Sequence, residues 1–98
     1  MQFIITTYNG EDMLGKRMTI RPRHLEGMAK LGKHIVCGGG LLGDEGKSKE
    51  SVIVFDLEDR AALDEYLRNE PYVTEQVWEK IKVDSLNVVI IDGKKVGG

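Results

Sequence analysis

Two ionisable residues, far apart in the 98-residue sequence, have the chemistry of a general acid–base pair. His24 follows Pro22 in a segment with the pattern of a helix start, where the helix dipole disfavours imidazolium and keeps a neutral base available. Glu70 directly precedes Pro71 at the end of a second predicted helix. If the two side chains meet, the carboxylate orients the imidazole and stabilises its protonated form. Two simpler roles stay open: a core histidine bonded to a backbone carbonyl, and a glutamate that caps a helix.

Two glycine-rich patterns resemble phosphate-binding motifs without the context that such motifs need. Residues 38–43 match G-x-G-x-x-G, but a charged loop at 43–49 follows, where a dinucleotide site needs the start of a helix. Gly46-Lys47-Ser48 resembles the end of a Walker A loop, yet five residues separate Gly40 from Gly46 where that motif has four. We therefore predict no nucleotide cofactor.

Metal-ligating residues show no ligand spacing either. His34 and Cys37 lie three residues apart on a predicted strand, so their side chains point to opposite faces of a sheet. We expect His34 to be an exposed residue and Cys37 to be a small hydrophobic residue of the core. The prediction is a protein without a metal site and without any other cofactor.

The hydrophobic pattern predicts how these residues are positioned. Residues 21–31 form a first helix, capped by Thr19 and stopped by Gly32, and a second helix follows the predicted cap Asp59 and ends at 69–71. A short helical turn is expected from Pro71 to Gln76. The predicted strands cover 3–8, 34–37 with a run into 38–40, 51–56, 78–83 and 86–91, before a polar tail, or a turn and a frayed end, at 92–98. This α+β order, βαββαβ with an extra C-terminal strand, is the ferredoxin-like plan of one antiparallel sheet with two helices on one face.

Composition narrows the functional classes. The sequence is 41% hydrophobic and 31% charged, as in an ordinary globular protein. A formal net charge of −2 gives no basic excess for binding nucleic acid. One cysteine excludes an intramolecular disulfide, and no stretch approaches the ~20 apolar residues that cross a bilayer. We expect a single domain over residues 1–98, cytoplasmic, with no nucleic-acid or membrane partner.

One face of the predicted sheet has no cover inside the chain. Ile4, Ile53, Phe55 and Val83 are too many apolar strand residues for two short helices to bury. A second copy of the sheet, packed face to face, would cover them, so we predict a homodimer. The strand at 86–91 is predicted to be an edge strand that pairs with the partner chain.

Four segments, in order, resemble the YciI-like (YCII-related) family. Residues 15–25 are similar to its R-x-x-H-L segment, 49–55 to its G-S-x-x-x-x strand, 69–73 to its D-P-[FY]-V segment and 77–83 to its closing strand. The resemblance implies a ferredoxin-like protomer, a dimeric α/β-barrel and a histidine–aspartate active site. It places the histidine at His24 and the acid at Glu70, a glutamate where the family usually has aspartate. Glu50 stands where the family has glycine.

The resemblance implies a small cofactor-independent enzyme of the lyase or isomerase type. His24 would move a proton on a small cyclic or carbonyl-containing substrate, and some relatives are associated with the breakdown of substituted aromatic rings. Arg21 would attract an anionic oxygen, while Ser51 and Tyr72 would donate hydrogen bonds. The alternative is a non-catalytic dimer that binds a metabolite or acts as a regulatory module. Cofactor-free oxygenase chemistry, known from other dimeric α/β-barrels, rests on architecture alone.

Overall fold

The computed structural model describes residues 1–46 and 48–97, except for the side chains of residues 48 and 49. Helices and strands follow one another along the chain in the βαββαβ order that the hydrophobic pattern predicts. They are β1 (Gln2–Asn9), α1 (Leu14–Leu31), the 3₁₀ turn η1 (Gly32–His34), β2 (Ile35–Leu42), β3 (Ser48–Asp56), α2 (Arg60–Asn69), α3 (Pro71–Thr74), β4 (Trp78–Leu86), β5 (Ile90–Ile91) and β6 (Lys94–Lys95).

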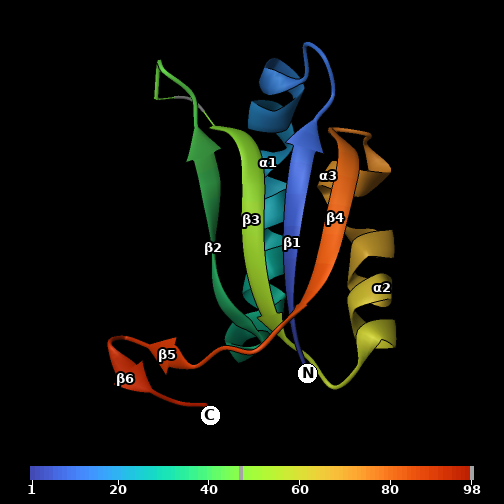
Figure 1. Cartoon of the computed structure of the whole chain (residues 1–98). Helices are drawn as coiled ribbons and strands as arrows, with labels where there is room; N and C mark the ends of the chain where they lie inside the picture. The colour runs from blue at the N-terminus through green and yellow to red at the C-terminus, as the bar shows by residue number, and fades with distance from the viewer. Residues whose placement is uncertain (47, 98) are drawn as a thin grey trace.

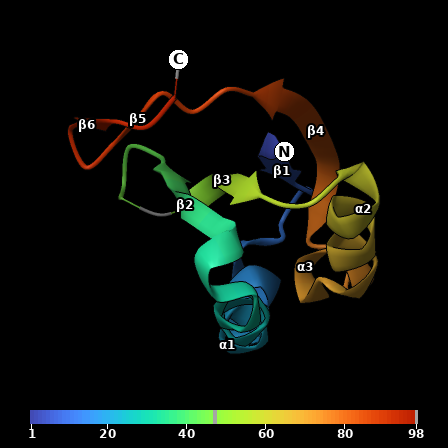
Figure 2. The ribbon, with the colours of Figure 1, turned by 90° about the horizontal axis from the view of Figure 1, so that it is seen from below.

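Four antiparallel strands form the main sheet in the order β2-β3-β1-β4, with β1 and β3 at its centre (Figure 1). Ile5 of β1 pairs with Ile53 of β3 on one side and with Val83 of β4 on the other. All three α-helices lie on one face of this sheet (Figure 2). The predicted ferredoxin-like topology is therefore confirmed.

The hydrophobic core lies between this sheet face and the helices. Strand residues alternate between the two faces, so every second residue of β1 and β3 points into the core. The helices and the segment before β4 supply the opposite wall. The buried core residues are Phe3, Ile5, Ile20, Ile53, Phe55, Leu57, Leu63, Tyr72, Val77 and Trp78.

Helix α1 begins at Leu14, seven residues before the predicted start at Arg21, and Pro22 lies inside it. Thr19, the predicted cap, is a helical residue whose hydroxyl donates to Gly15 O at 3.1 Å. Pro22 lies on the exposed side of the helix, so water can bond the carbonyl four residues earlier that proline leaves without a donor. The helix therefore continues through the proline.

The C-terminal region also differs from the prediction. Leu86 belongs to β4, and the next strand, β5, pairs with β6 of the same chain. The turn between them contains Asp92 and Gly93 at φ of 52° and 74°, the positive angles that an Asp-Gly hairpin turn favours. The predicted edge strand at 86–91 is thus divided between β4 and a short hairpin that is folded within the chain, and this hairpin includes residues 92–95 of the predicted tail, whose last residue lies outside the described part.

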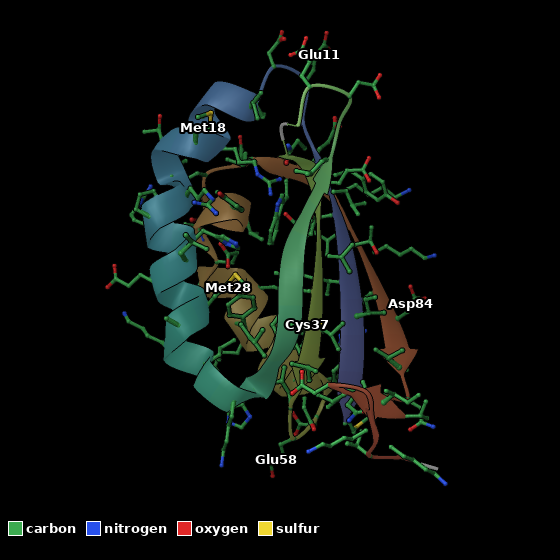
Figure 3. The ribbon with its side chains drawn as sticks, turned by 90° about the vertical axis from the view of Figure 1, so that its left-hand side faces the viewer. Glu11, Met18, Met28, Cys37, Glu58 and Asp84 are labelled. Atoms are coloured by element: carbon green, nitrogen blue, oxygen red, sulfur yellow. The ribbon has the colours of Figure 1, made fainter. Side chains whose placement is uncertain are left out.

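The sheet face away from the helices carries no helix among the described residues (Figure 2). Strand register places Ile4, Val52 and Cys37 on this open face. Cys37 is exposed, contrary to its predicted place in the core, because β2 bulges between Ile35 and Cys37 and so shifts the alternation. In Figure 3, Met28 lies between α1 and the sheet, whereas Asp84 points away on the open side.

Candidate active site

His24 and Glu70 meet in the interior although 46 residues separate them in the sequence. His24 Nδ1 lies 2.7 Å from Glu70 Oε1, and the two residues are 6% and 1% exposed. Because an ionised carboxylate only accepts hydrogen bonds, Nδ1 carries the proton in this pair. The second ring nitrogen, Nε2, has no hydrogen-bond partner among the described residues, so the neutral ring keeps a basic lone pair there.

The junction of α2 and α3 fixes the Glu70 carboxylate. Glu70 ends α2 and caps α3, whose first residue is Pro71. Oε1 accepts the Tyr72 backbone N–H at 3.1 Å as well as the His24 bond, and Oε2 accepts a hydrogen bond from the Tyr66 hydroxyl. The helix cap and the histidine partner are therefore the same carboxylate, and its extra methylene relative to aspartate still leaves His24 in reach.

Aromatic side chains surround the imidazole. The Tyr72 ring stacks on it with centroids 4.1 Å apart and planes 15° apart. Trp78 approaches His24 edge-on at 5.7 Å and Tyr72 at 5.3 Å. These contacts hold the ring of His24 in one orientation, as a positioned acid–base group requires.

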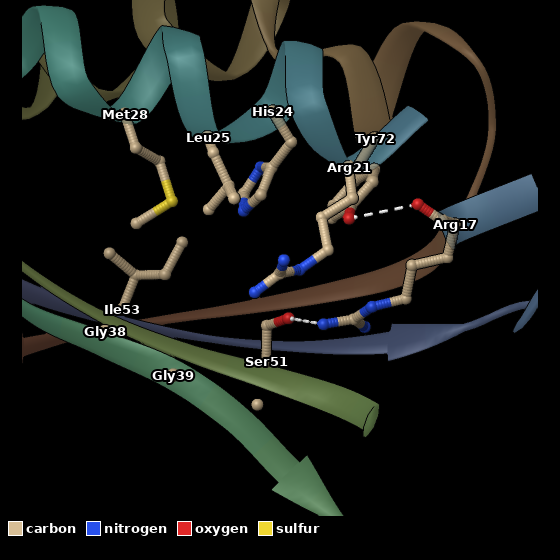
Figure 4. Close-up of a pocket in the computed structure, with 11 residues that line it drawn as sticks. Arg17, Arg21, His24, Leu25, Met28, Gly38, Gly39, Ser51, Ile53 and Tyr72 are labelled. Carbon is tan, nitrogen blue, oxygen red and sulfur yellow. Dashed lines mark hydrogen bonds between the residues drawn. The ribbon is translucent and has the colours of Figure 1, made fainter. Parts of the chain in front are cut away.

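A cavity of about 150 Å³ opens beside His24, between α1 and the strands β2 and β3 (Figure 4). A cavity of this volume is large enough for one six-membered ring. One part of the wall is apolar, with Leu25, Met28 and Ile53, and the other part is polar. The polar side chains that line the cavity are Arg17, Arg21, His24, Ser51 and Tyr72.

The structure thus brings together the five site residues expected from the sequence, but their contacts differ in detail. Ser51 Oγ accepts a bond of 2.6 Å from Arg17 Nη2, which leaves its own proton free to be donated. The Tyr72 hydroxyl donates to the Arg17 carbonyl at 3.2 Å, so its proton is already used. Arg21 is exposed and lies at the cavity wall.

The sequence analysis missed Arg17 and Tyr66. Arg17 falls outside the predicted helix, yet in α1 it lies on the same face as Arg21 and His24, four and seven residues later. A correct helix start would have revealed that spacing. Tyr66 stands four residues before Glu70, one helical turn away, but its bond to the carboxylate depends on how α2 ends.

Burial shifts the pKa of three groups, two at the cavity wall and one, Tyr66, bonded to Glu70. Desolvation, followed by the Glu70 carboxylate, raises the pKa of Tyr66, so its hydroxyl stays a neutral donor to Glu70. Desolvation likewise raises the pKa of Tyr72, against the opposing effect of the nearby arginines. Desolvation and then the charge of Arg21 lower the pKa of the Arg17 guanidinium, while Tyr72 opposes the shift.

The described residues contain neither a metal-ligand cluster nor a helix that could span a membrane. Within residues 1–46 and 48–97, no group of three or more His, Cys, Asp or Glu side chains is arranged to hold a metal ion. No helix in that part of the chain is long and apolar enough to cross a membrane.

Comparison with known proteins identifies the family and agrees with the fold. The YCII-related domain model matches residues 1–87. The chain belongs to the YCII-related family. No curated protein sequence matches it.

Solved structures of similar fold extend the comparison. A 5-chloro-2-hydroxyhydroquinone dehydrochlorinase from Burkholderia phenoliruptrix AC1100, in complex with 2,5-dihydroxybenzoquinone, is similar with a TM-score of 0.83 and 21% identity over 89% of this chain and 94% of that one. A putative antibiotic biosynthesis monooxygenase from Bacteroides thetaiotaomicron has a TM-score of 0.59 and 11% identity over 98% and 95%. At these identities the likeness shows a shared fold.

Proposed function

We propose that this YCII-related protein is a small cofactor-independent enzyme of the lyase or isomerase type. The observation that carries the proposal is the buried His24–Glu70 pair, with Nδ1 and Oε1 2.7 Å apart and His24 at the wall of a cavity of about 150 Å³. A general acid–base group is typically a histidine that a carboxylate orients and that reaches a small pocket.

In this proposal His24 Nε2 removes a proton from a carbon beside a carbonyl group of a small cyclic substrate. The electron pair of the C–H bond moves onto the carbonyl oxygen, which becomes an enolate. The imidazolium then returns its proton to another carbon, or the enolate electrons expel a leaving group as an anion and His24 passes its proton to water. Glu70 balances the charge of the imidazolium in both cases.

The other site residues have supporting roles in this proposal. Arg21 and the free proton of Ser51 face the developing oxyanion from the polar wall. Tyr72 acts through its ring, which lines the cavity and holds His24, because its hydroxyl is bonded to Arg17 O. The dehydrochlorinase of the same fold supports this class of reaction, since its name describes an elimination on a six-membered ring.

Thermal shift followed by NMR in D₂O tests the proposal. Small anionic ring compounds, halogenated and unhalogenated, are screened against wild type and His24→Gln, because a bound ligand raises the melting temperature. Compounds that bind are then followed by ¹H NMR for loss of a C–H signal or appearance of a product. We expect conversion by wild type and by Arg23→Gln, an exposed change on the same helix outside the cavity wall, and none by His24→Gln.

Two results would contradict this function. A compound that binds wild type and is never converted would make the protein a metabolite-binding module, the alternative drawn from the sequence. If no compound shifts the melting temperature of wild type and His24→Gln only melts lower, His24 is a structural histidine.

We further propose that two copies pack through the open face of the sheet. Ile4 and Val52 lie there without cover from any described helix. The hairpin β5–β6 lies on the same side of the sheet (Figure 2), and its Ile90 is 62% exposed. Such uncovered apolar surface on a small protein favours association with a surface of the same kind, and a second copy supplies one by symmetry.

A further inference from the structure

Arg17 is a buried cation without a buried anion. It is only 7% exposed, and its guanidinium donates to Asn9 Oδ1 at 2.9 Å and to Ser51 Oγ at 2.6 Å. Both acceptors are neutral. No carboxylate in the described part of the chain forms an ion pair with Arg17, whereas arginines as buried as this one are usually paired with an acid.

A second cation lies on the same face of the helix. Arg21 follows Arg17 by four residues in α1, so the two side chains are neighbours. Arg21 also forms no ion pair with a described residue. Figure 4 shows both guanidinium groups extending from α1 toward the sheet beside Ser51. Two like charges in one wall repel each other, and an anion between them would remove that repulsion.

The cavity wall away from the two arginines limits the shape of the anion that can bind. His24 lies between the arginines and the apolar wall of Leu25 and Met28. Strand β2 contributes Gly38 beneath this wall, where a Cβ atom would come within 3.3 Å of Met28 Cε. The three consecutive glycines at 38–40 bring no side chain into the cavity wall, so the strand backbone itself can contact a flat ring.

We propose that the Arg17–Arg21 end of the cavity binds the oxyanion of a planar, single-ring organic acid. The ring lies against Met28 and Gly38, and the oxyanion accepts hydrogen bonds from the two arginines. This arrangement places a ring carbon beside His24. The inference rests on the proposed function, which it deepens by specifying the charge and shape of the substrate.

Tyr72 links the anion site to the base. Its ring stacks on His24 at 4.1 Å, and the Arg17 Cζ atom lies 5.3 Å from the centre of the same ring. One rigid side chain therefore sets the spacing between the cation that holds the oxyanion and the histidine that moves the proton.

Benzoate and benzamide test the charge requirement, because they share a shape and differ in charge. Their affinities are measured by NMR titration of the full chain in low salt. We expect wild type to bind benzoate at least tenfold more tightly than benzamide, since a hydrogen bond to a charged partner is worth about 1.5–3 kcal/mol. Inorganic phosphate is titrated as a third probe and should bind more weakly than benzoate, because it lacks the ring.

Three arginine variants locate the binding site. Arg17→Met and Arg21→Met should each weaken benzoate about tenfold or more and leave benzamide unchanged, while the control Arg23→Met, exposed and outside the cavity wall, should bind both as wild type does. Arg21 is exposed, so its variant tests the proposal even if Arg17→Met folds poorly. Arg17→Lys keeps the charge and should retain part of the selectivity.

Several outcomes would overturn this inference. They are equal binding of benzoate and benzamide, no saturable benzoate binding at millimolar concentrations, phosphate binding as tight as benzoate, or an Arg21→Met variant that keeps wild-type selectivity. His24→Gln separates this result from the proposed function, because it should still select benzoate. A protein that selects benzoate over benzamide but converts no compound would contradict the proposed role of His24 alone. A protein that converts a compound but does not select benzoate would contradict the proposed role of the two arginines alone.

Discussion

The ring of Tyr72 stacks on the imidazole of His24, with centroids 4.1 Å apart and an interplanar angle of 15°. Tyr72 is 1% exposed, and its position follows from Glu70, whose carboxylate accepts the Tyr72 N–H while Oε1 also faces His24. The short helix α3 thus delivers both the carboxylate and the stacking ring to the same imidazole. Residues 70–72 supply the carboxylate and the ring that orient the base, and Trp78 of β4 adds an edge-on contact.

Two substitutions of Tyr72 distinguish the contribution of its ring to stability from the contribution of its hydroxyl. Tyr72→Phe keeps the stack and loses only the bond to Arg17 O, so we expect a loss of about 1 kcal/mol in unfolding free energy. Tyr72→Leu also removes the stack on His24 and the contact with Arg17, and should cost about 2–4 kcal/mol. Urea unfolding measures both, and equal losses for the two variants would show that the ring contacts contribute nothing.

Glu70 should determine which nitrogen of His24 carries the proton. In wild type the neutral ring is protonated at Nδ1, because the carboxylate 2.7 Å away only accepts. In Glu70→Gln the amide can donate as well as accept, so both tautomers should be populated. Long-range ¹H–¹⁵N spectra distinguish the two nitrogens, and the exposed His34 is an internal control that should not change. An unchanged His24 spectrum in Glu70→Gln would show that the pair does not form in solution.

Shortening Glu70 tests whether its length matters. Oε1 faces His24 while Oε2 accepts from the Tyr66 hydroxyl, and an aspartate on the same backbone falls short by one methylene. Because misplacing a catalytic group by about 1 Å costs of order 10²-fold in rate, we expect Glu70→Asp to lower kcat by about that factor. The KM for the converted compound should change little, because Glu70 does not line the cavity. A variant as active as wild type would show that the backbone adjusts to either acid.

Tyr66 should make the fold sensitive to alkali. Burial and the Glu70 carboxylate raise the pKa of Tyr66 in the folded protein above its value of about 10 in the unfolded chain. A raised pKa means that its contribution to stability is complete below about pH 10 and is lost as the pH rises further. The urea midpoint should therefore fall between about pH 9 and about pH 11 more steeply in wild type than in Tyr66→Phe. Equal slopes would show that Tyr66 ionises freely in the folded state.

The order of the helices and strands could be predicted from the sequence, whereas the start of α1 could not. The β-branched and aromatic residues at 3–8, the apolar run at 51–56 and the spacing of Ala62, Leu63 and Tyr66 in α2 are local patterns, and they predicted the correct element order. The start of α1 carries no such signal, because its cap residue, Met13, makes no side-chain hydrogen bond. Arg17 was missed as a direct consequence.

The pairing of His24 with Glu70 is a contact between residues far apart in the sequence, unlike the local patterns that define helices and strands. Its partners lie 46 residues apart, so no local pattern contains it, and only the family resemblance suggested that the two side chains meet. The Tyr66 bond and the cavity beside Gly38 depend in the same way on how helices and strands pack. Composition and periodicity define the elements, while the site arises from their assembly.

The open face of the sheet makes a prediction about assembly. Val52 lies there, paired with Thr6 and Gly39 and directed away from the core. Val52→Lys should therefore leave the protomer folded, as judged by circular dichroism, and convert a dimer to a monomer, because a charge buried at an interface without a partner is costly. Val52→Thr, of similar shape, should remain dimeric. Light scattering after size exclusion gives the mass, and a monomeric wild type at micromolar concentration would contradict the proposal.

Gly38 should control the size of the ligand that the cavity accepts. A Cβ atom at this position would lie 3.3 Å from Met28 Cε and 3.5 Å from Ile53 Cγ1. The methionine end is flexible and can move, so Gly38→Ala should fold with nearly wild-type stability while the space for a ring shrinks. We expect benzoate affinity to fall severalfold and phosphate affinity to stay the same.

Gly27→Ala is the control, at a helix position where a Cβ meets nothing within 4 Å. It should stabilise the protein by about 0.5–1 kcal/mol and leave benzoate binding intact. Unchanged benzoate binding in Gly38→Ala would place the ring elsewhere in the cavity.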